Sequence, residues 1–217
     1  MKVVGMMRAF GLVAACVLAL NVSAGNQQYE PLEASVRTAL AAAVANADLP
    51  EPRFKDSKEK VDWLTKMSLR LMKRKPDYRQ RIDFLKTVHY EATRAGLDPH
   101  MVLGLIEVES GFKKYAVSSA SARGYMQVMP FWTKLIGDGD PTKLFDMRVN
   151  IRYGCNILRH YIDRENGNLF LALGRYNGSR GKAEYPNLVL AAWRKWEDKP
   201  TPGVSIPLKP RYGDITQ

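Results

Sequence analysis

Apolar residues recur at helical spacing along most of this chain. Asp98 followed by Pro99 predicts a helix start, because an N-cap residue and a first-position proline are typical there. Residues 102, 105, 106 and 109 then fall on one face of that helix. Similar patterns predict six further helices, over 36–47, 57–72, 78–95, 149–164, 169–176 and 185–196. No repeat and no long alternating strand pattern accompanies them, so we expect an all-α fold.

The apolar face of the helix that starts at Asp98 includes one carboxylate. Val102, Leu105 and Ile106 share that face with Glu109, which lies in the last turn. A carboxylate there is costly unless it is paired or has a chemical role. Burial also raises the pKa of a carboxyl group, which suits a general acid. Glu107 lies about 200° around the helix from Glu109, so we expect it to be solvated.

Both ends of the chain have compositions that predict separate segments. Lys2 and Arg8 precede a short apolar run at 9–20, and the small residues 22–24 suit cleavage, so 1–24 reads as an export signal. Cys16 offers an alternative, a lipoprotein signal that would attach the protein to the outer membrane, although the apolar run continues past it. At the other end, 199–217 is rich in proline and predicts an extended tail.

Removing the predicted signal leaves about 193 residues, enough for one domain with a core. Lys and Arg fall from 33 to 31 while the acids stay at 22, so the net charge falls from +11 to +9. This excess suits a polyanionic wall or an anionic membrane surface as partner, and solubility alone explains it equally well. A nucleic-acid partner fits neither the export signal nor the buried acid. No further apolar run approaches a membrane span, so we expect a soluble mature protein.

Cysteine and histidine usage predicts neither a disulfide nor a metal site. Cys155 is alone after signal removal and lies in an apolar helical pattern, which indicates a buried structural thiol. His89, His100 and His160 show no metal-ligand spacing, so helix packing or surface positions are expected for them. The sequence indicates no cofactor.

The segment after Glu109 contains a second group of candidate residues. Gly124 permits close backbone approach, and Gln127 offers both donor and acceptor groups. Tyr125, Met126 and Trp132 offer surfaces that suit the face of a sugar, although such residues beside a helix usually pack in the core.

Several runs, in order, resemble the lytic transglycosylase family, and most closely its soluble lytic transglycosylase domain. ESGF at 109–112 and GYMQVMP at 124–130 resemble the family's E-S-x-x and G-L-M-Q-x-M-P. LFD and VNI, within 144–151, and NL, AL and YN, within 168–177, are similar to two further family segments. The resemblance covers roughly 80–196 and leaves 25–79 unexplained. It divides the chain into a signal (1–24), an N-terminal helical extension (25–79), a catalytic domain (80–198) and the tail (199–217).

The resemblance implies a goose-type-lysozyme-like helical fold and the glycan strands of bacterial peptidoglycan as substrate, and hence a periplasmic location. A cell-envelope assembly is a candidate partner, and the oligomeric state is open. The implied reaction breaks the bond between N-acetylmuramic acid and N-acetylglucosamine and leaves a 1,6-anhydro end. Ordinary glycosidases need two carboxylates, whereas one glutamate suffices when the substrate's own C6 hydroxyl attacks. Glu109 would first donate and then accept a proton, with a pKa raised towards about 6.

Other roles follow from the resemblance residue by residue. Ser110 would help to position the substrate, and Met126 and Gln127, with Gly124 and Tyr125, would line the cleft. Tyr176 would bond to Glu109 or to the sugar, and Asn177 would close the site. Packing for Tyr176, and helix-end capping for Ser110 and Asn177, are the structural alternatives.

Two departures from the family pattern bear on substrate preference. Tyr125 stands where the family often has Leu, and the usual AYNAGP is replaced by the more basic RYNGSRG at 175–181. Two other functions stay open. One is a hydrolytic muramidase that uses Asp138 or Asp140 to hold water, and the other is a non-catalytic wall-binding protein.

Overall fold

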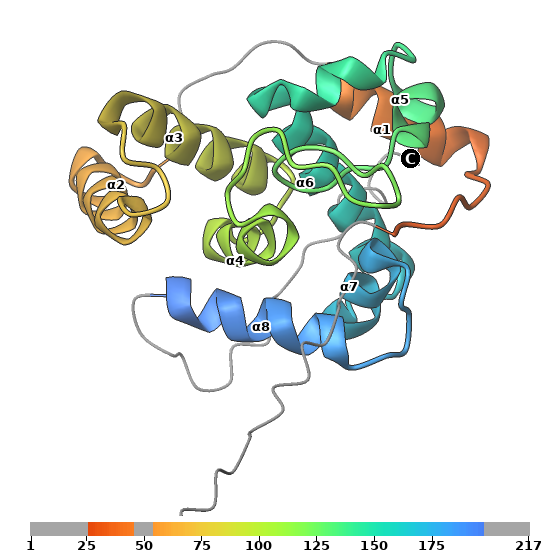
Figure 1. The fold of residues 1–217 in the computed structure, drawn as a ribbon. Coiled ribbons are helices and arrows are strands. Elements are labelled where there is room, and N and C mark those ends of the chain that lie inside the picture. Colours follow the sequence, from red (N-terminus) through yellow and green to blue (C-terminus); the bar gives the residue numbers. More distant parts are fainter. Residues whose placement is uncertain (1–25, 46–53, 198–217) are drawn as a thin grey trace, which may run out of the picture.

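The computed structural model describes residues 26–45 and 54–197, and these residues form an all-α fold (Figure 1). The only strand-like pairing among them consists of two isolated bridges, Val117 with Arg123 and Arg123 with Val128. The helices are α1 (Ala34–Ala45), α2 (Ser57–Leu71), α3 (Tyr78–Arg94), α4 (Pro99–Ser110), α5 (Phe131–Ile136), the 3-10 helix η1 (Pro141–Phe145), α6 (Met147–Arg164), α7 (Leu169–Asn177) and α8 (Glu184–Trp196). No helix in the described part is long and apolar enough to span a bilayer. The predicted signal and tail lie outside the described residues.

All seven predicted helices are present, with bounds within two residues of the predicted ones wherever the structure describes them. Asp98 caps α4 as expected, since its carboxylate accepts from the backbone N–H of His100 at 2.6 Å. The two elements that we did not predict, α5 and η1, have six and five residues. Elements this short do not complete the two turns over which helical periodicity can be recognised.

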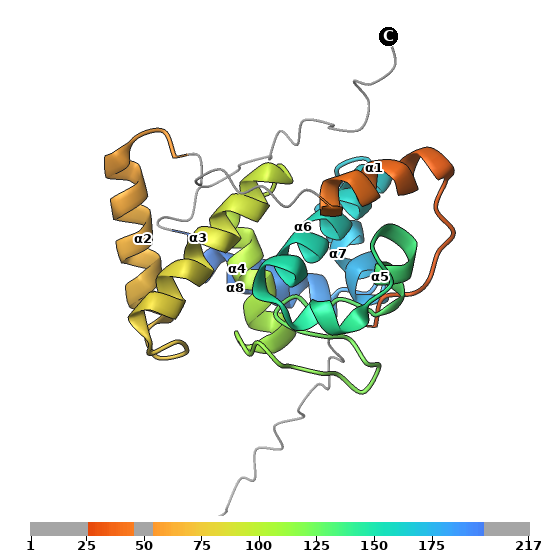
Figure 2. The same ribbon diagram turned by 90° about the horizontal axis from the view of Figure 1, so that it is seen from above.

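Helix α4 lies at the centre of the fold, packed against α3 and α8 (Figure 1). Helix α6 packs against α1, α3 and α7. Seen from above, α2 lies at one end of the molecule beside α3, and α1 lies at the other end beside α5 (Figure 2). Cys155 is buried within α6, as expected, and burial raises the pKa of its thiol well above the usual range.

Residues 26–33 are fastened to the domain by specific contacts. The buried side chain of Gln27 accepts from Trp132 Nε1 at 3.0 Å. Glu30 pairs with Arg164 and, at 2.7 Å, with Arg175. This first part of the predicted N-terminal extension therefore contributes directly to the packing of α5, α6 and α7.

Helices α4 and α8 approach each other unusually closely at Gly104. A Cβ atom at that position would lie 2.6 Å from the backbone nitrogen of Trp193 and 2.8 Å from its Cα. Only glycine allows this approach, which holds α8 tightly against α4. The consequence for the site is that Tyr185, on α8, reaches Glu109.

His89 is buried in an aromatic cluster between α2 and α3. Its ring stacks on Phe54 at 3.8 Å between centroids and meets Trp63 at 4.9 Å. Burial lowers the pKa of His89 to about 4, although the charge of Glu59 opposes that shift. His89 is therefore neutral in the folded protein at neutral pH.

We expect acid to destabilise the protein through His89. Between pH 6.5 and pH 4 the unfolded state binds a proton there that the folded state does not, so stability is lost as the pH falls through this window. The full loss would be about 3 kcal/mol in unfolding free energy. Urea unfolding at pH 7 and pH 4 should show this loss in the wild type and a smaller one in His89→Gln. Equal losses of unfolding free energy in both proteins would show that His89 is not the source of the acid sensitivity.

Candidate active site

Glu109 lies in the last turn of α4 and is only 5 % exposed, as its apolar neighbours predicted. The hydroxyl of Tyr185, on α8, donates to Glu109 Oε1. Burial, followed by the negative charge of Glu109, raises the pKa of Tyr185 well above its usual range. Tyr185 therefore stays protonated and remains a donor, which fixes the orientation of the carboxyl group.

The chain turns sharply after Ser110, and the side chain of Ser110 holds that turn. Gly111 and Phe112 both have left-handed backbone angles, with φ of 56° and 67°. Ser110 Oγ donates to the backbone carbonyl of Tyr125 at 2.8 Å, so it ties the end of α4 to the loop that follows. Ser110 is buried, and its predicted role in positioning the substrate stays a prediction.

Asn150, at the start of α6, clamps this loop. Its Oδ1 accepts from the backbone N–H of Met126 at 2.8 Å, and its Nδ2 donates to the carbonyls of Arg123 at 2.7 Å and Leu144 at 2.8 Å. Gly124 has φ of 75°, and a Cβ there would lie 2.4 Å from Nδ2 of Asn150. Gly124 is therefore required by the clamp, a role that we did not predict for either residue.

Met126 and Gln127 were predicted to line the cleft, and the structure shows both side chains buried. Gln127 is 1 % exposed, with φ of 48°, and its amide donates to the carbonyls of Gly124 and Ala116 at 2.9 and 3.1 Å. Met126 packs against Gly154 of α6. Both side chains stabilise the loop that follows Glu109.

Tyr176 and Asn177 lie at the end of α7. The hydroxyl of Tyr176 donates to the carbonyl of Met126 at 2.8 Å. The hydrogen bond to Glu109 comes from Tyr185, and contact between Tyr176 and the sugar, the other expected role, stays a prediction. Asn177 Nδ2 donates to Ser179 Oγ at 3.1 Å, just past the end of the helix.

Tyr125 and Glu107 have partners that the sequence did not indicate. Tyr125 is buried, and its hydroxyl accepts from Lys75 Nζ at 2.6 Å. Glu107 was expected to be solvated, and this prediction is wrong. Its carboxylate accepts from Trp196 Nε1 at 2.8 Å and from Arg74 at 3.3 Å, because the end of α8 covers this side of α4.

The basic loop that replaces the family's usual segment is held by a buried carboxylate. Arg180 donates to both oxygens of Glu165, at 2.7 and 3.0 Å, and Arg175 also contacts this group. The hydrogen bond from Arg180 is the largest of the effects that lower the pKa of Glu165 to about 2. These two arginines are therefore engaged within the protein.

Asp138, which is exposed, and Asp140, which is half-buried, are the alternative carboxylates, and both already have partners. Asp138 pairs with Lys143, which lowers its pKa, and Asp140 accepts from the backbone and hydroxyl of Thr142 at the start of η1. Both aspartates line a hollow of about 500 Å³ with residues of α1, α5 and α6. The residues that line this hollow include none from α4.

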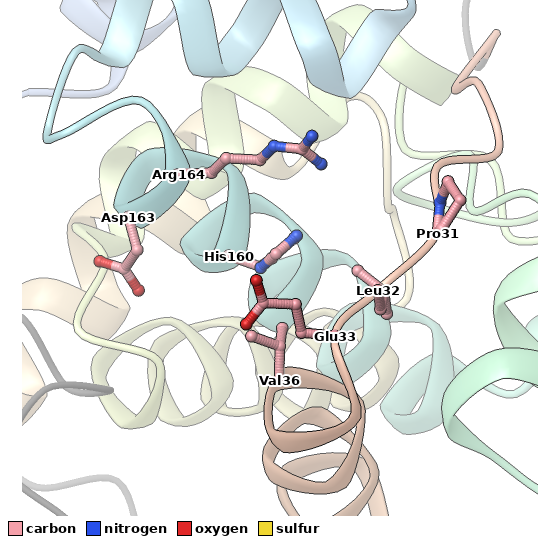
Figure 3. Close-up of a pocket in the computed structure, with 7 residues that line it drawn as sticks. All are labelled: Pro31, Leu32, Glu33, Val36, His160, Asp163 and Arg164. Carbon is pink, nitrogen blue, oxygen red and sulfur yellow. The ribbon is translucent and has the colours of Figure 1, made fainter. Parts of the chain in front are cut away.

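A second hollow, of about 380 Å³, lies between residues 31–36 and the end of α6 (Figure 3). His160, Asp163 and Arg164 form one wall, and Pro31, Leu32 and Val36 supply the apolar part. It is separate from Glu109. Among the described residues, no group of His, Cys, Asp and Glu is arranged to hold a metal ion.

Residues 86–187 match the family model described as the Transglycosylase SLT domain. The matched residues include Glu109, the loop that follows it, and Tyr185. This part of the chain, residues 86–187, belongs to the lytic transglycosylase family. Over 83 residues it is 40 % identical to a membrane-bound lytic murein transglycosylase C of Mannheimia succiniciproducens, covering 35 % of this chain and 23 % of that protein. Over 104 residues it is 31 % identical to a transglycosylase of Enterobacteria phage PRD1, covering 48 % of this chain and 38 % of that protein.

Among solved structures, the chain is similar to an inactive mutant of the lytic transglycosylase Slt from Pseudomonas aeruginosa. The identity is 25 %, the TM-score is 0.47, and the match covers 51 % of this chain and 23 % of that one. The chain thus spans well under half the length of each of these proteins.

Proposed function

We propose that this protein is a peptidoglycan lytic transglycosylase. It would cleave the bond between N-acetylmuramic acid and N-acetylglucosamine without water and leave a 1,6-anhydro end. The observation that carries the proposal is the buried carboxylate of Glu109, oriented by Tyr185 within an SLT domain. The names of the similar proteins, which are lytic murein transglycosylases, support the same substrate.

The proposed mechanism uses one carboxyl group twice. Glu109 first donates its proton to the leaving glycosidic oxygen. As a carboxylate, it then accepts the proton of the C6 hydroxyl while that oxygen bonds to the anomeric carbon. A hydrolytic glycosidase would need a second carboxylate close to the first. Asp138 and Asp140 are engaged in a hollow without α4 residues, which supports the single-acid route.

The proposed location is the bacterial cell envelope. Peptidoglycan lies outside the cytoplasm, and 1–24 has the composition of an export signal. Similar proteins are named membrane-bound, which supports an envelope location. Within the envelope, residues 80–198 would be the catalytic domain and 25–79 an extension that packs on it.

Mass spectrometry of fragments released from purified peptidoglycan tests the reaction. We expect anhydro-muramyl products, about 18 mass units lighter than their hydrolysed counterparts because no water is added. Glu109→Gln is the control that excludes a contaminating enzyme. Products with reducing ends would contradict the proposal and identify a hydrolytic muramidase. Absence of release would favour a wall-binding protein.

A further inference from the structure

Two short basic segments meet where α4 ends and the active-site loop begins. Arg74 and Lys75 come from the turn between α2 and α3, and Lys113 and Lys114 follow the turn after Ser110. The guanidinium of Arg74 lies 5.8 Å from the centre of the Phe112 ring and pairs with Glu107. The described residues supply no carboxylate that pairs with the three lysines.

Lys75 is held in place without a counter-charge. Its ammonium group donates to the hydroxyl of Tyr125 at 2.6 Å and lies 4.7 Å from the centre of that ring. It also lies 4.9 Å from the centre of the Phe84 ring. Burial, together with the charge of Lys114, lowers the pKa of Lys75. The structure thus keeps a desolvated cation next to a second cation, an arrangement that a bound anion would stabilise.

Helix α4 alone does not account for this concentration of charge. The end of a helix carries about half a negative charge, and Arg74 and Glu107 largely neutralise one another. The positive charge of the three lysines, Lys75, Lys113 and Lys114, is therefore larger than the partial negative charge at the end of α4.

The cluster is connected directly to the catalytic segment. Lys75 contacts the Tyr125 side chain, and the Tyr125 carbonyl accepts from Ser110, the residue after Glu109. Lys75 lies outside the part of the chain that matches the SLT domain. Tyr125 stands where the family often has Leu. Lys75 and Tyr125 are therefore candidates for residues that determine which substrate this protein prefers.

We propose that Lys75, Lys114 and Tyr125 form a subsite that binds a carboxylate of the peptide stems on the glycan strand. The proposal rests on the proposed function, because it assumes peptidoglycan as the substrate. Lys75 would form a charge-assisted hydrogen bond to the carboxylate, Tyr125 would hold the ammonium group in position, and Lys114 would add a second positive charge. The protein would then prefer strands that retain their stems.

Two labelled substrates test the subsite: glycan strands that retain their stems, and strands from which an amidase has removed them. Binding is measured by fluorescence anisotropy in the Glu109→Gln background, so that it does not depend on turnover. Lys75→Gln should raise the Kd for stem-bearing strands about tenfold and change the Kd for stripped strands by less than about twofold. Lys114→Gln should act in the same direction, and Lys75→Arg should restore much of the affinity. Added salt should reduce the difference between substrates.

Lys58→Gln is the matched control, because Lys58 is an exposed lysine at the far end of α2. It should leave both Kd values unchanged. An equal loss of affinity for both substrates in Lys75→Gln would overturn the subsite and show that Lys75 only shapes the loop. Wild-type protein that leaves both strands uncut, while the Lys75 effect on stem-bearing strands persists, would refute the proposed function and support the subsite.

Discussion

Replacing Glu109 with Gln is expected to lower peptidoglycan turnover by about 10³-fold, within the range observed for loss of a general acid. Glutamine has nearly the same shape, and its carbonyl can still accept from Tyr185. It can neither donate a proton to the leaving oxygen nor accept one from the C6 hydroxyl. The measurement is the initial rate of soluble fragment release, with binding to the strands expected to persist.

Tyr185→Phe gives the matched comparison for Glu109→Gln. It preserves the buried ring and the carboxyl group and removes only the donated hydrogen bond, so we expect a smaller loss, about tenfold. Both variants and the wild type should unfold cooperatively, as expected of a single domain of this size. Turnover close to normal in Glu109→Gln would contradict its assignment as the acid, whatever the result for Tyr185→Phe.

Local signals made Glu109 and the helix that carries it predictable. The N-cap and proline at the start of α4 and the period of its apolar residues belong to a single short stretch of sequence. Burial of that stripe follows from the pattern, because a helix with one apolar face packs that face inward. The same reasoning located all the longer helices, since each has an apolar stripe of several turns.

Tyr185 could not be found in this way. It lies 76 residues from Glu109, and its contact depends on the close approach of α8 at Gly104. Asn150 and Lys75 are similar cases, because each acts on the loop from another helix or turn. No periodic pattern links residues that meet only after the helices have packed.

The internal contacts of the loop residues could not be predicted either. The family resemblance assigned substrate roles to Met126, Gln127 and Tyr176, and these roles stay predictions. In the structure their polar atoms serve backbone groups, or the side chain packs, because a loop buried against two helices must satisfy its own donors and acceptors. The chemistry of a residue suggests what it can bind, whereas tertiary packing decides what it faces.

Gly104→Ala is expected to destabilise the protein by about 2–3 kcal/mol, the cost of overpacking a close contact. In an exposed helix the same change would stabilise by about 1 kcal/mol, so the sign itself tests the packing. The added Cβ would meet backbone atoms of Trp193 and Ala192, which cannot rotate away. Helix α8 must therefore shift as a unit and carry Tyr185 away from Glu109, so turnover should fall together with stability.

Gly154→Ala is the matched control, another glycine within a helix and close to a neighbour. There the added Cβ would meet Sδ and Cε of Met126, which can rotate away, and only one atom fixed to the backbone, Met126 Cβ at 2.7 Å. Urea unfolding should therefore show a clearly smaller loss for Gly154→Ala than for Gly104→Ala. If Gly104→Ala were as stable as the wild type, α8 would be free to move relative to α4. The hydrogen bond between Tyr185 and Glu109 would then not depend on the close approach of the two helices at Gly104.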